Sequence, residues 1–326
     1  MSNPERVVVL GASGFVGSAT CLALERLGMK VLRLSAPRLP GTTLDAAADC
    51  VVSESQVVER LAEQFRGARA VVNAAGNPDA SSRDLPALVA ANAALPGLVA
   101  SAVVSAGVAR FVHISSAVVQ GRRPVLDETD RYDTFSDYAR SKALGEELAV
   151  RFGDGATVVY RPPSVHGPDR RVTKLTARIA ASPVGTVARP GSAPSPQAHI
   201  ANVAEAVAYL ATTAQVPPSV VIHPWEGLTT ADVLELLGRR RPVELPRPIA
   251  RLSVRGLELL GRMLPSVAAN ARRIEMLWFG QRQARSWLTD SGWSPPAGRE
   301  AWTELGDFVL RSSSRSAETT RRSKNG

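Results

Sequence analysis

The chain has 326 residues, of which 44% are hydrophobic, enough to fill the core of one large α/β domain or of a large domain that carries a smaller one. Its N-terminus passes from MSNPE directly into a short apolar run, without the charged region, long apolar stretch and cleavage site of a secretory signal. No window reaches the roughly 18–20 uninterrupted apolar residues of a membrane-spanning helix. We therefore expect a cytoplasmic protein without a membrane span.

The net charge of +9 is unevenly distributed along the chain. Residues 239–326 hold 17 Lys or Arg and 8 Asp or Glu, whereas the first 238 residues carry 22 of each. The arginines are scattered through amphipathic segments and a polar tail, and they lack the interleaved aromatic residues of a nucleic-acid-binding surface. We expect no nucleic-acid partner. A polyanionic small molecule, such as a nucleotide diphosphate, remains compatible with the charge.

Metal-ligating residues do not form a recognisable pattern. Two cysteines, Cys21 and Cys50, are too few for a disulfide framework or a thiolate metal site. The four histidines are widely separated and have no companion carboxylates or cysteines. The sequence therefore predicts no metal centre.

Apolar runs of strand length alternate with segments of helical periodicity, which is typical of a parallel sheet covered on both faces. Helices are expected at 15–28, 54–66, 85–106 and 136–152. Strands are expected at 6–10, 30–34, 70–74, 110–115 and 156–161, with a weaker one at 48–52 that would complete the first half of the sheet. The predicted fold class is α/β, with a Rossmann-type doubly wound sheet over residues 1–162.

After residue 162 the Pro- and Gly-rich stretches RPPSVHGP and ARPGSAPSPQ break this alternation. We expect a smaller, mostly helical substrate-binding lobe over 163–311, with segments from about 195–225 returning to the first domain. Its helices are expected near 201–214, 229–237, 249–263, 267–285 and 298–311. The polar residues 312–326 are expected to form a disordered tail.

A glycine-rich segment, Gly11-Ala-Ser-Gly14-Phe-Val-Gly17, joins the first strand to the first helix. Such a turn lets the backbone approach a pyrophosphate closely, and it directs the helix N–H groups and the positive end of the helix dipole toward the phosphates. A glycine triplet alone could be an ordinary tight turn. Its position between a strand and an amphipathic helix favours dinucleotide binding.

The residues that follow the second strand discriminate between dinucleotides. An acidic residue there would hydrogen-bond the ribose 2′-hydroxyl and repel a 2′-phosphate. This chain has Ser35 at that position, with Arg33 in the strand and Arg38 just beyond it. NADP(H) is therefore favoured over NAD(H), unless both arginines merely face solvent.

A candidate catalytic centre follows the strand at 110–115. Ser115-Ser116-Ala117 lies at the carboxyl edge of the sheet, where an open α/β fold binds its ligands. Tyr138 and Lys142 are one helical turn apart and share a helix face. A nearby ammonium lowers the pKa of a phenol, which would let Tyr138 exchange a proton with a carbonyl or alcohol while Ser116 binds the same oxygen.

The combination of motifs resembles the extended branch of the short-chain dehydrogenase/reductase superfamily, which includes nucleotide-sugar epimerases, dehydratases and ketoreductases. The resemblance covers roughly residues 6–310. It rests on GASGFVG, VVNAAG at 71–76, FVHISSAVVQG at 111–121, YARSK at 138–142, YRPPSVHGP at 160–168 and SGWSP at 291–295.

The resemblance implies roles for individual residues. Catalysis would depend on Ser116, Tyr138 as the base, and Lys142, which would also hold the nicotinamide ribose. Tyr138 and Lys142 would also bind the cofactor. The other cofactor-binding residues would be Gly11, Ser13, Gly14, Phe15, Val16, Gly17, Arg33, Ser35, Arg38, Ala74, Ala75, Gly76, Asn92, Pro162, Pro163 and Ser164. The family also commonly forms homodimers, through helices that correspond to 85–106 and 136–152.

Two departures from the family pattern leave the substrate open. The chain has Val119-Gln120-Gly121 where the family often has Val-Tyr-Gly, and His166 where it often has tyrosine. The candidate substrate contacts are Ser116, Val118, Gln120, His166 and His199. A lone histidine is also commonly structural.

Four functions therefore stay open. The first is an NADPH-dependent ketoreductase acting on a nucleotide-linked keto-sugar, and the second is a nucleotide-sugar epimerase with a retained NAD. The third is a dehydrogenase or reductase of a steroid-like or lipid-linked substrate, suggested by the apolar helix of ELPRPIARLSVRGLELLGRMLP, which could equally be core. The fourth is a dinucleotide sensor without enzymatic activity, which the intact Ser/Tyr/Lys set disfavours.

Overall fold

A computed structural model describes residues 5–263, 272 and 274–324 of the chain and divides it into two compact units. The first unit contains the chain up to Pro163, Ile200–Pro224 and Ala284–Pro295. The second contains Ser164–His199, Trp225–Gln283 and the chain from Pro296 onward. The domains expected from the sequence, 1–162 with a return from about 195–225 and 163–311, stay predictions.

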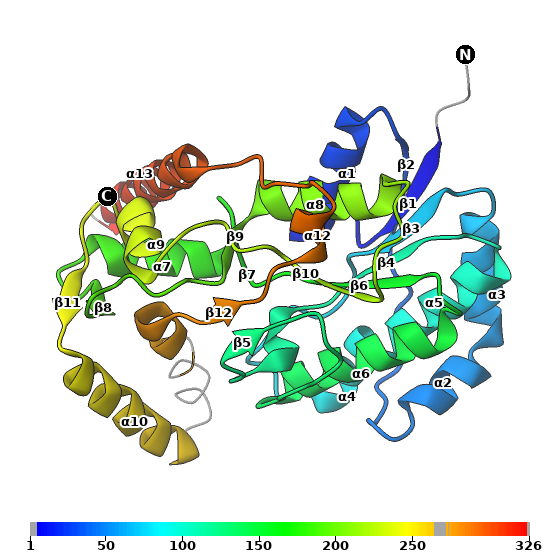
Figure 1. The fold of residues 1–326 in the computed structure, drawn as a ribbon, viewed down its shortest axis with the longest axis horizontal. Coiled ribbons are helices and arrows are strands. Elements are labelled where there is room, and N and C mark those ends of the chain that lie inside the picture. The colour runs from blue at the N-terminus through cyan, green and yellow to red at the C-terminus, as the bar shows by residue number, and fades with distance from the viewer. Residues whose placement is uncertain (1–4, 264–271, 273, 325–326) are drawn as a thin grey trace. The chain divides into compact units, whose positions relative to one another are not determined.

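The first unit is built on a six-stranded parallel sheet with the order β10-β6-β4-β3-β1-β2 (Figure 1). The five main predicted strands are confirmed within one residue at each end. The strands are β1 Arg6–Leu10, β2 Lys30–Leu34, β3 Ala70–Asn73, β4 Phe111–Ile114, β6 Thr157–Arg161 and β10 Val220–Ile222. Strand β1 lies between β2 and β3. The chain first moves from β1 outward to β2 and then crosses back to β3 on the other side of β1, so the strand order reverses at this point. Ligands of such folds bind where the strand order reverses.

Helices cover both faces of this sheet (Figure 1). Helices α1 (Phe15–Arg26) and α8 (Ile200–Thr212) pack together on one face, and α3 (Ser55–Phe65), α5 and α6 (Asp137–Phe152) cover the other. The main apolar core of the unit lies between the sheet and this second set of helices and contains Val8, Leu10, Phe65, Leu98 and Phe111. The short elements of the unit are β5 Val125–Leu126 and α12 Trp287–Asp290.

One long helical run in this unit is apolar around its whole circumference. It consists of α4 (Leu85–Val89), a π-helical turn (Ala90–Ala94) and α5 (Leu95–Ser105). Its length and composition would suffice to cross a membrane, which differs from the expectation that no segment would, but most of it is buried inside the unit. Burial of this kind is typical of a core helix in a large α/β fold.

The expected strand at 48–52 is wrong, because these residues lie in helix α2 (Ala47–Ser53). The segment buries Ala47 and Val51, four positions apart, while Val52 is 71% exposed. That spacing matches one face of a helix, and a strand would have buried alternate residues. Strand β2 consequently stays at the edge of the sheet.

The second unit combines short strand pairs with helices. Strand β7 (Ser164–His166) pairs with β9 (Gln197–His199), and β8 (Thr186–Ala188) pairs with β11 (Val243–Leu245), both in parallel. A small core around Leu237, Trp302 and Leu305 joins the helices α7, α9 and α13. The remaining elements are α7 Arg171–Ala181, α9 Thr230–Gly238, α10 Arg247–Met263, β12 Arg282–Gln283 and α13 Arg299–Lys324.

Two expectations for this unit need comment. The helix expected at 267–285 lies partly outside the described residues, although 274–279 are helical. The tail expected to be disordered from 312 differs from the structure, in which α13 continues to Lys324. Once a helix is nucleated, each further residue adds a hydrogen bond, and this segment has no Gly or Pro to interrupt it before Gly326.

Deleting residues 313–326 should leave both the melting temperature and the activity nearly unchanged. Within this polar segment Ala317 is the single hydrophobic residue, so the deletion removes little apolar surface from any core. Thermal unfolding and turnover of the truncated chain, compared with the full chain, measure the effect. A drop of several degrees in melting temperature would show that the segment packs against the protein.

Candidate active site

The glycine-rich segment forms a close-packed cradle at the carboxyl end of β1. Gly11 has φ +74°, and a Cβ there would lie 2.7 Å from the backbone nitrogen of Ala75. A Cβ on Gly17 would lie 2.1 Å from the carbonyl oxygen of Gly11. Larger residues cannot occupy either position without moving the backbone. The glycines therefore bring the start of α1 against the loop that follows β3.

The N-terminus of α1 has the properties of an anion site. Gly14 is its N-cap and provides no capping side chain, and the first turn of α1, which the structure describes in full, carries no acidic residue. The first N–H groups of a helix lack intrahelical partners and attract phosphate oxygens. Ser13 is exposed, and Phe15 and Val16 are half-buried around this terminus. The cradle and the bare terminus together fit the pyrophosphate of a dinucleotide.

The residues after β2 are accessible to a ligand. Ser35 and Arg38 are both exposed. Arg33 forms an ion pair of 2.8 Å with Glu25 of α1. The Arg33 guanidinium is thus already paired with a carboxylate.

The loop after β3 lies close to the candidate catalytic helix. The Ala74 N–H donates to the Leu10 carbonyl at 2.9 Å, which fixes this loop beside β1. A Cβ on Gly76 would lie 2.8 Å from Asn92 Oδ1 and 3.3 Å from Lys142 Nζ. The loop at Gly76, Asn92 and Lys142, all of which the family resemblance selects, therefore lie close together in the structure.

Asn92 is fully buried in the π-helical turn and connects these segments. Its Oδ1 accepts a hydrogen bond of 2.9 Å from the Asn77 N–H, and its Nδ2 donates to the Asn77 carbonyl and to Ser141 Oγ. Single π-turns inside helices occur frequently at functional sites. The Asn92 amide holds the loop after β3 against α6, beside Lys142.

Lys142 is buried on α6, and its Nζ lies 3.4 Å from the Ile114 carbonyl at the end of β4. Burial lowers the pKa of this ammonium to about 8, against the opposing effect of the Glu146 carboxylate one turn away. The charge of Lys142 can therefore respond to pH near neutrality.

Tyr138 and Ser116 stand at the ends of neighbouring elements. Tyr138 is the second residue of α6 and is half-buried, and the Ser136 hydroxyl caps this helix by accepting from the Ala139 N–H. Ser116 caps the short 3₁₀ helix η2 (Ala117–Gln120), where its Oγ accepts from the Val118 N–H at 3.3 Å. That bond uses the oxygen as acceptor, so the hydroxyl proton can be donated to a substrate oxygen.

A buried ion pair includes a residue on the same helix as Lys142, one turn further along, and sequence reasoning missed it. Arg161 and Glu146 form an ion pair with exposures of 0% and 1%. The Ser115 hydroxyl also donates to Glu146, and Arg161 Nη1 donates to the Thr129 carbonyl at 2.7 Å. Glu146 follows Lys142 by one helical turn, and Arg161 ends an apolar strand. A carboxylate one turn after Lys142 and an arginine at the end of an apolar strand are the sequence features that could have indicated a buried ion pair.

Other predicted residues lie around the same edge. Pro162 accepts a hydrogen bond from the Ala117 N–H, and Val118 is half-buried in η2. Gln120 is fully buried. Its Nε2 donates to Asp127 Oδ1 at 2.7 Å, and its Oε1 accepts from the Asp127 N–H at 2.8 Å. This arrangement holds the loop, and a direct contact of Gln120 with substrate stays a prediction.

The two histidines selected as substrate contacts belong to the second unit and lie side by side. His166 on β7 is in register with His199 on β9, and both rings lie within 6 Å of the Trp302 ring, at 5.4 and 5.9 Å. His166 Nε2 pairs with Gln197, while its buried Nδ1 has no hydrogen-bond partner among the described residues. Burial lowers the pKa of His166 to about 4, so the ring is neutral at pH 7.

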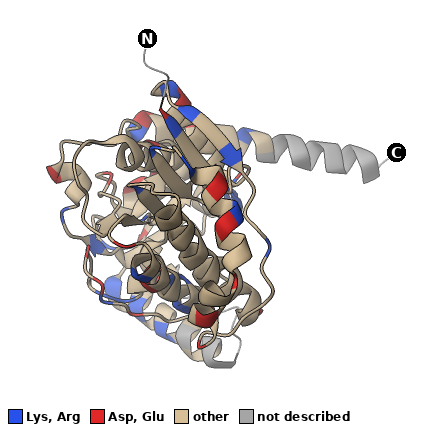
Figure 2. Cartoon of the chain, turned by 90° about the vertical axis from the view of Figure 1, so that its right-hand side faces the viewer, with Lys and Arg blue, Asp and Glu red and all other residues tan. Residues whose placement is uncertain are grey.

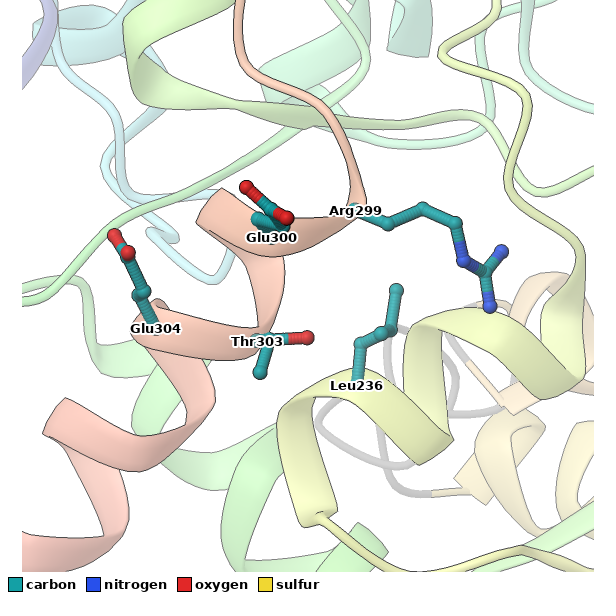
Figure 3. A pocket seen from close by; sticks show the side chains of 5 residues that line it. All are labelled: Leu236, Arg299, Glu300, Thr303 and Glu304. Atoms are coloured by element: carbon teal, nitrogen blue, oxygen red, sulfur yellow. The ribbon is translucent and has the colours of Figure 1, made fainter.

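A hollow of about 330 Å³ in the same unit is lined by Leu236 of α9 and by residues of α13. Figure 3 shows the side chains that line it. The α13 residues are Arg299, Glu300, Thr303 and Glu304. Arg299 is paired with Asp232 at 2.7 Å. None of the predicted site residues lines this hollow, and we assign no ligand to it.

Charged residues of both signs occur throughout the elements of the fold that Figure 2 shows. Figure 2 shows Lys and Arg interspersed with Asp and Glu along the elements in view, instead of gathered on one continuous basic face. Among the described residues, no group of three or more His, Cys, Asp or Glu could hold a metal ion.

Comparison with known families identifies the class of protein. Residues 7–222 match the NAD dependent epimerase/dehydratase family. The chain belongs to this family. The expected fold class and family are confirmed.

The most informative sequence relative is the ceramide reductase of Caulobacter vibrioides, which is 32% identical over 181 residues. The match covers 55% of this chain and 52% of the relative, so the chain spans about half the length of that protein.

Solved structures share the fold. The dTDP-4-dehydrorhamnose reductase of Bacillus anthracis, in complex with NADP, has a TM-score of 0.63 at 16% identity and covers 95% of this chain and 99% of its own. The UDP-glucuronic acid 4-epimerase of Bacillus cereus, in complex with NAD, has a TM-score of 0.63 at 17% identity, over 94% and 99%. At these identities the likeness supports the fold alone.

Proposed function

We propose that the chain is an NADPH-dependent ketoreductase that uses Ser116, Tyr138 and Lys142. The observation that carries the proposal is the position of Lys142: its buried ammonium lies beside Gly76 and Asn92, at the sheet edge where the glycine cradle also lies. The two loops that we expect to bind the cofactor and the helix that carries Tyr138 and Lys142 thus meet at one place.

Each residue of the proposed site would have its own role in carbonyl reduction. The Ser116 hydroxyl donates a hydrogen bond to the carbonyl oxygen and orients it. Tyr138 delivers its phenolic proton to the same oxygen as negative charge develops there. Lys142 lowers the pKa of the phenol through its positive charge, which makes the proton easier to transfer. Asn92 keeps the loop after β3 in contact with α6.

The chain's residues fit a nicotinamide dinucleotide. The cradle of Gly11, Gly14 and Gly17 and the uncapped start of α1 would hold its pyrophosphate, and Lys142 would hold its ribose. When bound, the reduced nicotinamide supplies the hydride that carbonyl reduction requires. Pro162, Pro163 and Ser164 would border the nicotinamide ring.

We expect Ser35→Asp to weaken NADPH binding about ten- to hundredfold while affecting NADH much less. The new carboxylate would repel the 2′-phosphate and remove the hydrogen bond that Ser35 would donate to it. A charge-assisted hydrogen bond is worth roughly 1.5–3 kcal/mol. Arg38→Ala should act in the same direction. Binding of both cofactors to the parent and the two variants measures the effect, with Arg26→Ala on α1 as a control for a lost exposed arginine. A parent that prefers NADH would move the proposal to the epimerase with a retained NAD.

The substrate has two candidate classes. Sequence reasoning puts a nucleotide-linked keto-sugar first. A sequence relative that is 32% identical over 181 residues is named ceramide reductase, and because ceramide is a lipid this observation favours a lipid ketone instead. We place the lipid ketone first, because the nucleotide-sugar neighbours share only the fold.

A direct assay distinguishes the two classes. NADPH oxidation by the purified chain is followed with a long-chain aliphatic ketone in detergent micelles and, separately, with a nucleotide-linked keto-sugar. Turnover of the first alone supports the lipid substrate, and turnover of the second alone supports the sugar. Isomerisation of a nucleotide sugar without net NADPH consumption would overturn the reductase.

The pH dependence of the reaction should follow Lys142. The ammonium is charged below its pKa of about 8 and loses its charge above it, so its help to the phenol is present at low pH and disappears as the pH rises. We expect kcat/KM for ketone reduction to fall as the pH rises through about 8. A pH–rate profile of the parent measures this, and a profile that stays flat through this region would contradict it.

Two coarser expectations complete the proposal. We expect a homodimer formed through helices 85–106 and 136–152, in which Val104 and Val150 are more than 40% exposed. We expect the enzyme to act in the cytoplasm. Sedimentation of the purified chain tests the first expectation, and fractionation of the source cells tests the second.

A further inference from the structure

Helix α10 (Arg247–Met263) exposes an apolar stripe to solvent. Ile249, Leu252, Leu259 and Leu260 are 54–71% exposed. Their positions recur at spacings of three and four residues through Gly256, so they lie along one side of the helix. A different side carries Ala250 and Val254, which are buried within the second unit. The exposed leucines therefore do not contribute to the core on which the helix rests.

A row of arginines runs beside this stripe. Arg247, Arg251 and Arg255 are spaced four residues apart and are all exposed. The first turn of α10 carries no acidic residue. Just upstream, Arg240 is exposed as well, while Arg239 and Arg241 form ion pairs with Asp307 and Glu235. The described part of α10 thus has three sides: one packed, one apolar and exposed, and one basic.

This combination is the pattern of a helix that lies in the surface of a membrane. Such helices bury an apolar side at the boundary of headgroups and acyl chains while Arg and Lys contact anionic lipid phosphates. A core helix would not expose four large aliphatic side chains, and a helix at a protein interface is usually depleted in charge at its centre. The arginine row favours a bilayer as the occupant.

We propose that α10 docks the protein on the surface of a bilayer that contains anionic phospholipid, with its apolar stripe inserted and its arginine row on the phosphates. The proposal goes beyond the reductase activity. It does not depend on which ketone is reduced or on which cofactor is used.

The test is flotation of the full chain with vesicles of phosphatidylcholine, with and without phosphatidylglycerol, in the absence of substrate and cofactor. We expect the parent to float with the anionic vesicles and to stay behind with pure phosphatidylcholine. The double variant Leu252→Glu/Leu259→Glu removes the apolar contact, and Arg251→Gln/Arg255→Gln removes part of the charge. Each should bind at least about tenfold more weakly, and raised salt should weaken the parent more than the arginine variant.

The matched control is Leu22→Glu, a leucine on α1 that is 55% exposed. It should float like the parent. Circular dichroism and gel filtration establish that each variant is folded and show its oligomeric state. A parent that does not bind anionic vesicles overturns the proposal, as do α10 variants that bind as tightly as the parent. A parent that ignores vesicles but forms a dimer that Leu252→Glu/Leu259→Glu dissociates would assign the stripe to a second copy of the chain instead.

Discussion

Tyr138→Phe should lower turnover by roughly a hundredfold or more and leave the fold and cofactor binding intact. The substitution removes one oxygen from a half-buried residue at the start of α6, so little packing is lost. The loss in rate is that of general acid catalysis, which contributes typically ~10²–10⁴-fold. Turnover under saturating NADPH, together with cofactor affinity measured by fluorescence, gives both quantities.

Two further variants make this result specific. Tyr209→Phe removes a phenol from α8 whose hydroxyl donates to the Ser291 carbonyl, and it should keep nearly normal turnover. Lys142→Met should lower both turnover and cofactor affinity, because the lysine is assigned both to the phenol and to the ribose. Near-normal turnover of Tyr138→Phe would remove this tyrosine from the mechanism.

Arg161→Met should reduce the free energy of unfolding by about 3–5 kcal/mol. The variant leaves the Glu146 carboxylate buried without its guanidinium partner, and the remaining Ser115 and Tyr132 hydroxyls carry no positive charge to replace it. An unpaired buried charge is among the most destabilising features a fold can have. Denaturant unfolding of the parent and the variant measures the difference.

A double variant and an exposed pair separate charge from packing. In Glu146→Leu/Arg161→Met both charges are gone, so much of the lost stability should return. Arg26→Met breaks the surface pair between Arg26 and Glu205, whose side chains are 61% and 25% exposed, and should cost less than about 1 kcal/mol. If Arg161→Met cost as little as Arg26→Met, the buried pair would not be the structural element described here.

The fold was largely readable from the sequence because its elements have strong local signals. Strands such as Arg6–Leu10 and Lys30–Leu34 are short apolar runs bounded by loops, and their ends were predicted to the residue. The segment 48–52 was misread, because a short apolar run fits a strand and a buried helix turn equally well. What decides between them is which neighbours cover the segment, and that is a tertiary property.

The sequence motifs predicted the main residues of the candidate site, but they did not predict the buried residues that surround it. The glycine turn and Lys142 were selected from local patterns and Asn92 from the family resemblance, and the structure brings Asn92 and Lys142 together beside Gly76. The pairing of Glu146 with Arg161 was missed, because the two residues come from a helix and a strand and only the folded sheet places them in contact. The proximity of His166 and His199 depends in the same way on the pairing of β7 with β9.

The π-helical turn at Ala90–Ala94 acts as a phase shift in an otherwise regular helix. A π-turn accommodates one residue more than an α-helical turn, so the side chains after it are rotated by roughly 100° relative to a continuous helix. The faces of α4 and α5 are therefore set independently, and removing a single alanine from the turn would rotate one of them out of its packing. A relative with one residue fewer in this turn could place a different side chain where Asn92 lies. Sequences should therefore be aligned with Asn92 by the position of the π-helical turn, and not by counting residues along the helix.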